Sequence, residues 1–99
     1  MSAALDFHRA KAQAYKKTLE ATPGPQKHEQ ASNIIAKQVN ELVEAIKTEF
    51  PDAAQHLPPT ITWANPFASR TGWSDVKLVE MEMMLNQIIG VLDVLRASR

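Results

Sequence analysis

Four glutamates on two segments with helical periodicity are the residues of this sequence best suited to chemistry. Glu41 and Glu44 lie one helical turn apart, and Glu80 and Glu82 lie on a later apolar segment. Oxygen ligands, carboxylates among them, suit Mg²⁺, so four acids on two adjacent helices could hold a divalent cation. The arrangement defines one alternative for function, a small Mg²⁺- or Mn²⁺-dependent hydrolase with helix-borne carboxylates at a dimer interface.

The segment Glu41-Leu-Val-Glu44 resembles the first metal-binding pair of the helical nucleotide pyrophosphohydrolases related to MazG. Those enzymes add a downstream Glu-x-x-Asp pair, which has no counterpart here, because the sequence reads Glu-Met-Glu-Met from Glu80. Glu80 and Glu82 also project in different directions from a helix. Lysines surround the first pair, which favours a solvated helix face. We therefore predict no metal site and no cofactor.

Other catalytic residue types lack the spacing that their chemistry requires. His8, His28 and His56 fall in different segments and form no His-x-x-x-His pair. We expect His8, which lies on an apolar stripe, to be an edge-of-core residue that bonds a carbonyl or water. No serine stands in a Gly-x-Ser-x-Gly context, and the chain has no cysteine and no glycine-rich phosphate loop. Covalent catalysis has no support, and an enzyme is the less favoured class.

Length and charge narrow the alternatives further. The chain has 99 residues with 11 basic and 11 acidic side chains, so we expect one domain, 1–99, without a net field that attracts nucleic acid. A nucleic-acid accessory role for the dispersed basic residues of segment 9–17 is the weakest alternative. The amino terminus lacks the features of a secretory signal, and no apolar run can span a bilayer. We expect a cytoplasmic protein that does not enter membranes.

Two helices are predicted in the first half of the chain. Residues 3–21 are rich in good helix formers and have a weak apolar stripe. Prolines and a glycine at positions 22–25 end this helix, and Pro25 suits the first turn of the next, where no amide donor is needed. The second helix, 25–50, has the clearest amphipathic stripe. Pro51 ends it, and we expect a short helical turn at 51–57.

The connection at residues 58–73 contains both tryptophans, three prolines and no acidic residue. A connection of this length in a small domain is usually functional or packed down by its own side chains. Aromatic and arginine side chains dominate binding hot spots, so Trp63, Phe67, Arg70 and Trp73 form a candidate loop site for a peptide or small ligand. The alternative, which we favour, is that the tryptophans cover the open end of the helices.

The last helix, predicted at 74–97, carries the strongest signal in the sequence. From Asp75 to Leu95, 13 of 21 residues are Val, Ile, Leu or Met, and Ser74 suits the amino-terminal cap. Apolar residues spaced by three and four form a seam that predicts ordinary core: Leu78, Met81, Leu85, Ile88, Leu92 and Leu95. A looser set, named here the second stripe, lies on another face: Val76, Met83, Met84, Val91 and Val94. Gly90 is either a close helix crossing or a tolerated surface glycine.

The predicted fold class is all-α, a three-helix bundle with helices at about 3–21, 25–50 and 74–97 and a long aromatic crossover loop. The chain can cover the seam but not the second stripe, and so much exposed apolar surface is unusual for a monomer. Homodimerisation through the last helix is the simplest solution, because two-fold symmetry lets one patch complement itself. The leading hypothesis is a non-enzymatic interaction or oligomerisation module, a small regulatory or adaptor protein whose partner-binding residues are the second stripe.

Overall fold

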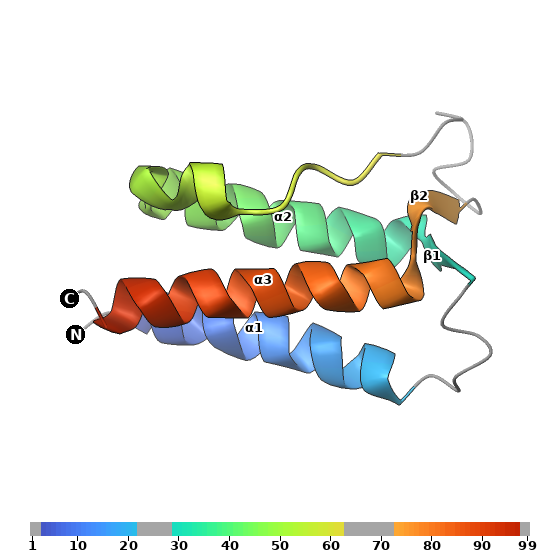
Figure 1. Cartoon of the computed structure of the whole chain (residues 1–99), viewed down its shortest axis with the longest axis horizontal. Helices are drawn as coiled ribbons and strands as arrows, with labels where there is room; N and C mark the ends of the chain where they lie inside the picture. Colours follow the sequence, from blue (N-terminus) through green and yellow to red (C-terminus); the bar gives the residue numbers. More distant parts are fainter. Residues whose placement is uncertain (1–2, 22–28, 63–72, 98–99) are drawn as a thin grey trace.

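A computed structural model describes residues 3–21, 29–62 and 73–97 of the chain. The described part is predominantly helical, which confirms the all-α class. Its helices are α1 (Ala3–Glu20), α2 (Asn33–Glu49), the short 3₁₀ helix η2 (Pro51–His56) and α3 (Leu78–Ala97). Two short strands, β1 (Gln30–Ser32) and β2 (Trp73–Lys77), precede α2 and α3 (Figure 1). No helix in these ranges combines the length and apolarity needed to cross a lipid bilayer.

The three α-helices lie side by side, with α1 antiparallel to the other two (Figure 1). The first turns of α1 contact the last turns of α2 and of α3. Nε2 of His8 lies 3.2 Å from Oε1 of Glu49 on α2, and Oδ1 of Asp6 lies 3.2 Å from Nη1 of Arg96 on α3. The helices α2 and α3 therefore run parallel to each other. Each directly follows one of the two strands in the sequence.

The core forms where the apolar stripes of the three helices face one another. On α3 the predicted seam is confirmed as core: Met81, Leu85, Ile88 and Leu92 are buried, and Leu78 and Leu95 at its ends are partly buried against them. The stripe of α2 is buried at Val39, Leu42, Val43 and Ile46. From α1 come Leu5, Ala12 and Leu19. Apolar burial of this kind is the main favourable term that holds the helices together.

The two strands shift the starts of α2 and α3 from their predicted positions. They pair antiparallel, with Gln30 opposite Lys77 and Ser32 opposite Trp73. As a result α2 begins at Asn33 rather than Pro25, and α3 begins at Leu78 rather than Ser74, so both predicted starts are wrong. The pairing gives hydrogen-bond partners to backbone groups ahead of each helix.

Side chains then cap α2 and α3 at these starts. The hydroxyl of Ser32 accepts a hydrogen bond from the backbone N–H of Ile35 at 3.4 Å, which is the role of an N-cap residue. At α3, Oε1 of Glu80 accepts from the backbone N–H of Lys77 at 3.1 Å. This contact is the carboxylate half of a capping box. The cap predicted at Ser74 is therefore replaced by Glu80.

After α2 the chain turns back along the helices as a segment that we call the strap, residues 51–62. Its first part is the predicted short helical turn, confirmed as η2 with Pro51 at its start. Its second part runs extended beside α2 (Figure 1). Buried side chains anchor the strap to the core: Ala53, Leu57, Pro58 and Ile61.

Candidate interaction groove

The second stripe lines two adjacent hollows between α3 and the strap, which together we call the groove. Val76, Met83 and Met84 line a first hollow of about 490 Å³. Val91 and Val94 line a second hollow of about 570 Å³. Gln87 borders both hollows, so the two are neighbours along α3. All five residues that the sequence placed on this stripe therefore face the same groove.

Exposure differs among the five residues. Met83 and Val94 are each 66% exposed, whereas Val76, Met84 and Val91 are partly buried against the core. Val76 belongs to β2 and not to the helix. The sequence provided no cover for this stripe within the chain, but the strap supplies part of one. Within the second stripe, the exposed apolar area is therefore concentrated at Met83 and Val94.

The opposite wall of the groove belongs to the strap. Residues 58–62 line the first hollow, and Asp52, Ala53 and His56 line the second. Of the described lining residues only Glu80 and Asp52 are acidic, both are exposed, and none is Lys or Arg. Such a groove can receive apolar side chains without burying a charge at its centre, which would be costly.

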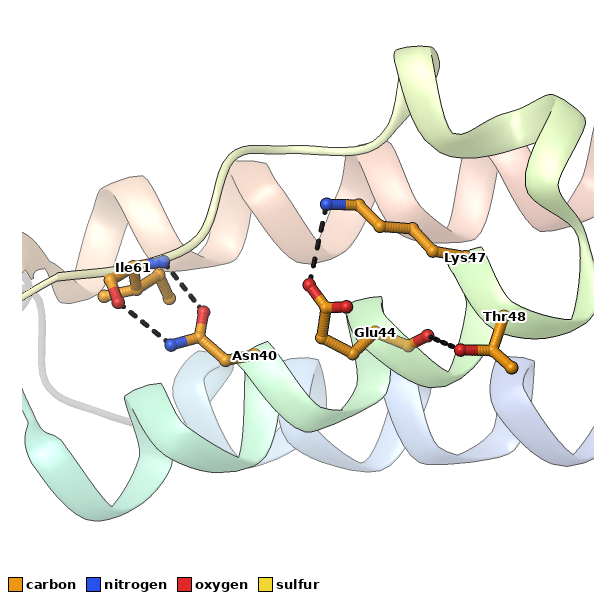
Figure 2. A network of polar contacts seen from close by, with 5 residues as sticks. All are labelled: Asn40, Glu44, Lys47, Thr48 and Ile61. Carbon is orange, nitrogen blue, oxygen red and sulfur yellow. Dashed lines mark hydrogen bonds and ion pairs between the residues drawn. The ribbon is translucent and has the colours of Figure 1, made fainter.

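Two side-chain amides fix the strap in place. Nδ2 of Asn40 donates to the carbonyl of Ile61 at 2.9 Å, and Oδ1 of Asn40 accepts from the N–H of Ile61 at 2.7 Å (Figure 2). Asn40 thus forms hydrogen bonds with both the N–H and the carbonyl of Ile61, as a neighbouring strand would. On the other side, Nε2 of Gln87 donates to the carbonyl of His56 at 2.8 Å. These bonds fix the position of the strap relative to α2 and α3.

Gly90 leaves an open space in the second hollow. No atom outside the local helix lies within 4 Å of the position that a Cβ would take there. A close helix crossing at Gly90 within the described chain is therefore excluded. The glycine instead interrupts the row of side chains that α3 presents to the groove, between Gln87 and Val94.

Two of the four glutamates considered as metal ligands, Glu44 and Glu80, have other partners. Glu44 forms an ion pair with Lys47 at 3.7 Å, with its side chain 64% exposed, on the solvated face of α2 (Figure 2). Glu80 caps α3. Among the residues that the structure describes, no three His, Asp or Glu side chains come close enough to share a metal ion. The geometry thus gives the hydrolase alternative no support.

His8, Arg9 and Lys16 of α1 serve packing and pairing. His8 is buried at the contact with α2, as predicted, but its partner is the carboxylate of Glu49 rather than a carbonyl or water. Arg9 donates from Nε to Asp93 at 2.8 Å, and this hydrogen bond raises the pKa of Arg9. Lys16 lies 3.5 Å from Glu20. Acids thus offset these bases of α1, and a phosphate backbone would have to compete for them.

The candidate loop site cannot be placed in the fold. Trp63, Phe67 and Arg70 lie outside the described residues, as does the side chain of Trp73, so this site stays a prediction. Comparison of the chain with protein-family models, with curated proteins and with solved structures gives no match. The groove and its residues are therefore interpreted from the geometry of this chain alone.

Proposed function

We propose that this protein is a non-enzymatic helical interaction module, a small adaptor or regulatory protein that forms a homodimer through the groove. The observation that carries the proposal is the convergence of all five second-stripe residues on two adjacent hollows. Apolar side chains that stay in contact with water in the monomer favour association, because covering them removes that contact. The groove thus supplies both the driving force and a defined shape for a partner.

Energetics support Met83 and Val94 as the principal contributors. Each is 66% exposed, and complete burial of a Met or Val side chain stabilises by about 1.5–3 kcal/mol relative to full exposure. Val76, Met84 and Val91 have less area left to lose, because they already pack against the core. We therefore propose a three-helix bundle as the unit that dimerises. The face of α3 that exposes Met83 and Val94 lies at the proposed interface. The cytoplasmic location stays a prediction.

Sedimentation equilibrium on the wild type and on a Met83→Glu variant tests this proposal. A carboxylate buried in an apolar interface opposes association, so the variant should dissociate at least about tenfold more readily, which corresponds to about 1.4 kcal/mol. Ile34→Glu is the matched control, because Ile34 is 67% exposed on α2 and does not line the groove. Equal weakening by both substitutions would assign association to a nonspecific apolar effect and contradict the proposed surface.

A further inference from the structure

We infer that the groove receives α3 of a second copy in antiparallel orientation, with a two-fold axis at Gln87 and with Met83 seated over the partner's Gly90. This inference rests on the proposed homodimer and specifies its geometry. It follows from the positions of five residues along α3 and from the open space beside one of them.

Gln87 lies at the centre of the α3 face that borders the groove. Met84 and Met83 lie three and four residues before it, and Gly90 and Val91 lie three and four residues after it. At about 100° per residue, all four fall within about 60° of Gln87 around the helix. Met83 and Gly90 lie on one side of Gln87, and Met84 and Val91 lie on the other.

A two-fold axis beside Gln87, perpendicular to α3, makes the two copies of α3 antiparallel. The side of α3 that carries Met83 and Gly90 then faces the same side of the partner's α3. Met83 therefore faces the partner's Gly90, and Met84 faces the partner's Val91. A parallel pair would instead set Met83 against the partner's Met84, with two long side chains at one level. It would also leave the space at Gly90 facing only the partner's Val91.

The antiparallel pairing matches a protruding side chain to a vacant position. Met83 is 66% exposed, and its unbranched thioether chain adapts to irregular gaps. Gly90 has no side chain, and a Cβ there would meet nothing within 4 Å. The match occurs twice, once on each side of the axis, as in helix pairs that pack knobs into holes. One patch thus complements itself, which is the condition for a closed two-fold dimer.

The extent and charge of the groove also suit a second copy. Ten described residues line the first hollow and eight the second, with Gln87 in both, which makes seventeen. Ala53, Pro58 and Ile61 among them are already buried, and a standard interface uses about 20–30 residues on each side, so the fourteen that remain supply about half of one or more. From Met83 to Leu95, the lining residues that α3 contributes are uncharged. About an axis at Gln87, residues 83–91 of the two copies face each other, and Glu80 lies opposite the partner's Val94, so no two like charges meet.

An exchange of large and small residues tests the contact between Met83 and Gly90. Gly90→Leu fills the vacant position, and we expect the dimer dissociation constant to rise at least about tenfold. Met83→Ala combined with Gly90→Leu restores the room, and the constant should return to within about threefold of the wild type. Lys37→Leu, which adds the same side chain on an exposed position of α2, is the control. Far-ultraviolet circular dichroism confirms that each variant retains its helices.

Single cysteines test the orientation, because the chain contains none. Gln87→Cys gives up the hydrogen bond to His56, but the bonds of Asn40 to Ile61 remain; it places two thiols beside the axis and should give a disulfide-linked dimer under mild oxidation. Met83→Cys should not form one. Antiparallel helices separate the two copies of residue 83 by about 12 Å along the helix axis, whereas a disulfide needs Cα atoms about 4.4–6.8 Å apart. Efficient linkage through Met83→Cys would indicate parallel helices and overturn the inference.

The outcomes separate this inference from the proposed function. A wild type that stays monomeric contradicts both. A dimer that Met83→Glu weakens but Gly90→Leu leaves intact retains the proposed surface and rejects the antiparallel contact. A dimer weakened by Gly90→Leu and restored by the double variant supports both.

Discussion

The side-chain amide of Asn40 forms two hydrogen bonds with the backbone of Ile61, at 2.9 Å to its carbonyl and 2.7 Å from its N–H (Figure 2). This contact joins the middle of α2 to the extended part of the strap. Ile61 is itself buried and lines the first hollow. The shape of the groove therefore depends on a residue that does not belong to α3.

Asn40→Ala removes both partners of the Ile61 backbone. Because a polar group left unsatisfied in a buried position costs about 1–3 kcal/mol, we expect the free energy of unfolding to fall by that amount in urea titration. Gln38→Ala, at an exposed position of the same helix, is the control and should change it by less than about 0.5 kcal/mol. Equal effects of the two substitutions would show that Asn40 does not hold the strap.

Ser32→Ala tests the start of α2. As the N-cap, Ser32 supplies the hydroxyl that accepts from Ile35, so its loss should reduce the free energy of unfolding by about 1 kcal/mol. If the helix began at Pro25, Ser32 would lie inside it, and alanine would raise stability by a few tenths of a kcal/mol. Thr48→Ala is a matched control, because Thr48 donates to the carbonyl of Glu44 within the helix and caps nothing. The sign of the Ser32 effect decides between the two starts.

The buried His8 provides a third test, of its packing role. Nδ1 of His8 has no hydrogen-bond partner among the described residues, and the side chain of Glu49 is 44% exposed. His8→Leu should therefore change the free energy of unfolding by less than about 1 kcal/mol, because the apolar side chain leaves no polar atom unsatisfied and water can solvate Glu49. His8→Ala should lower it by about 2–3 kcal/mol through lost packing. Equal losses in both variants would instead assign the contribution to the bond with Glu49.

Periodicity predicted the long elements well. The helix expected at 3–21 is observed as Ala3–Glu20, and the seam of α3 is buried as expected. Both are local properties, because residues three and four apart on one helix share a face. The strands β1 and β2 were missed because each is too short to show a period and forms only by pairing with a distant segment. Their presence moved both predicted helix starts.

The start of α3 had no clear local signal in the sequence. Ser74 and Asp75 precede an apolar run, which made them candidates for the cap. Glu80 stands three residues after Lys77, which is the carboxylate spacing of a capping box, but that pattern begins with Ser, Thr, Asp or Asn, and Lys77 is none of these. The spacing of the acidic residues indicated Glu80 only as a candidate metal ligand. The structure uses it to satisfy the N–H of Lys77.

The sequence predicts the side of the groove that α3 forms but not the side that the strap forms. Helical spacing placed most of the second stripe on one face of α3, which is the floor of the groove. Its wall depends on the bonds of Asn40 to Ile61 and of Gln87 to His56, which join residues 21 and 31 positions apart. No local pattern marks such contacts. The sequence therefore left the stripe without a cover, whereas the strap covers part of it.

The most direct test of the central claim is the weight-average mass of the wild-type protein by sedimentation equilibrium, from about 1 to 200 µM, a range that brackets micromolar dissociation constants. A homodimer built through the groove predicts a rise with concentration toward twice the 11.0 kDa of the chain. A single 11.0 kDa species across the whole range would contradict it.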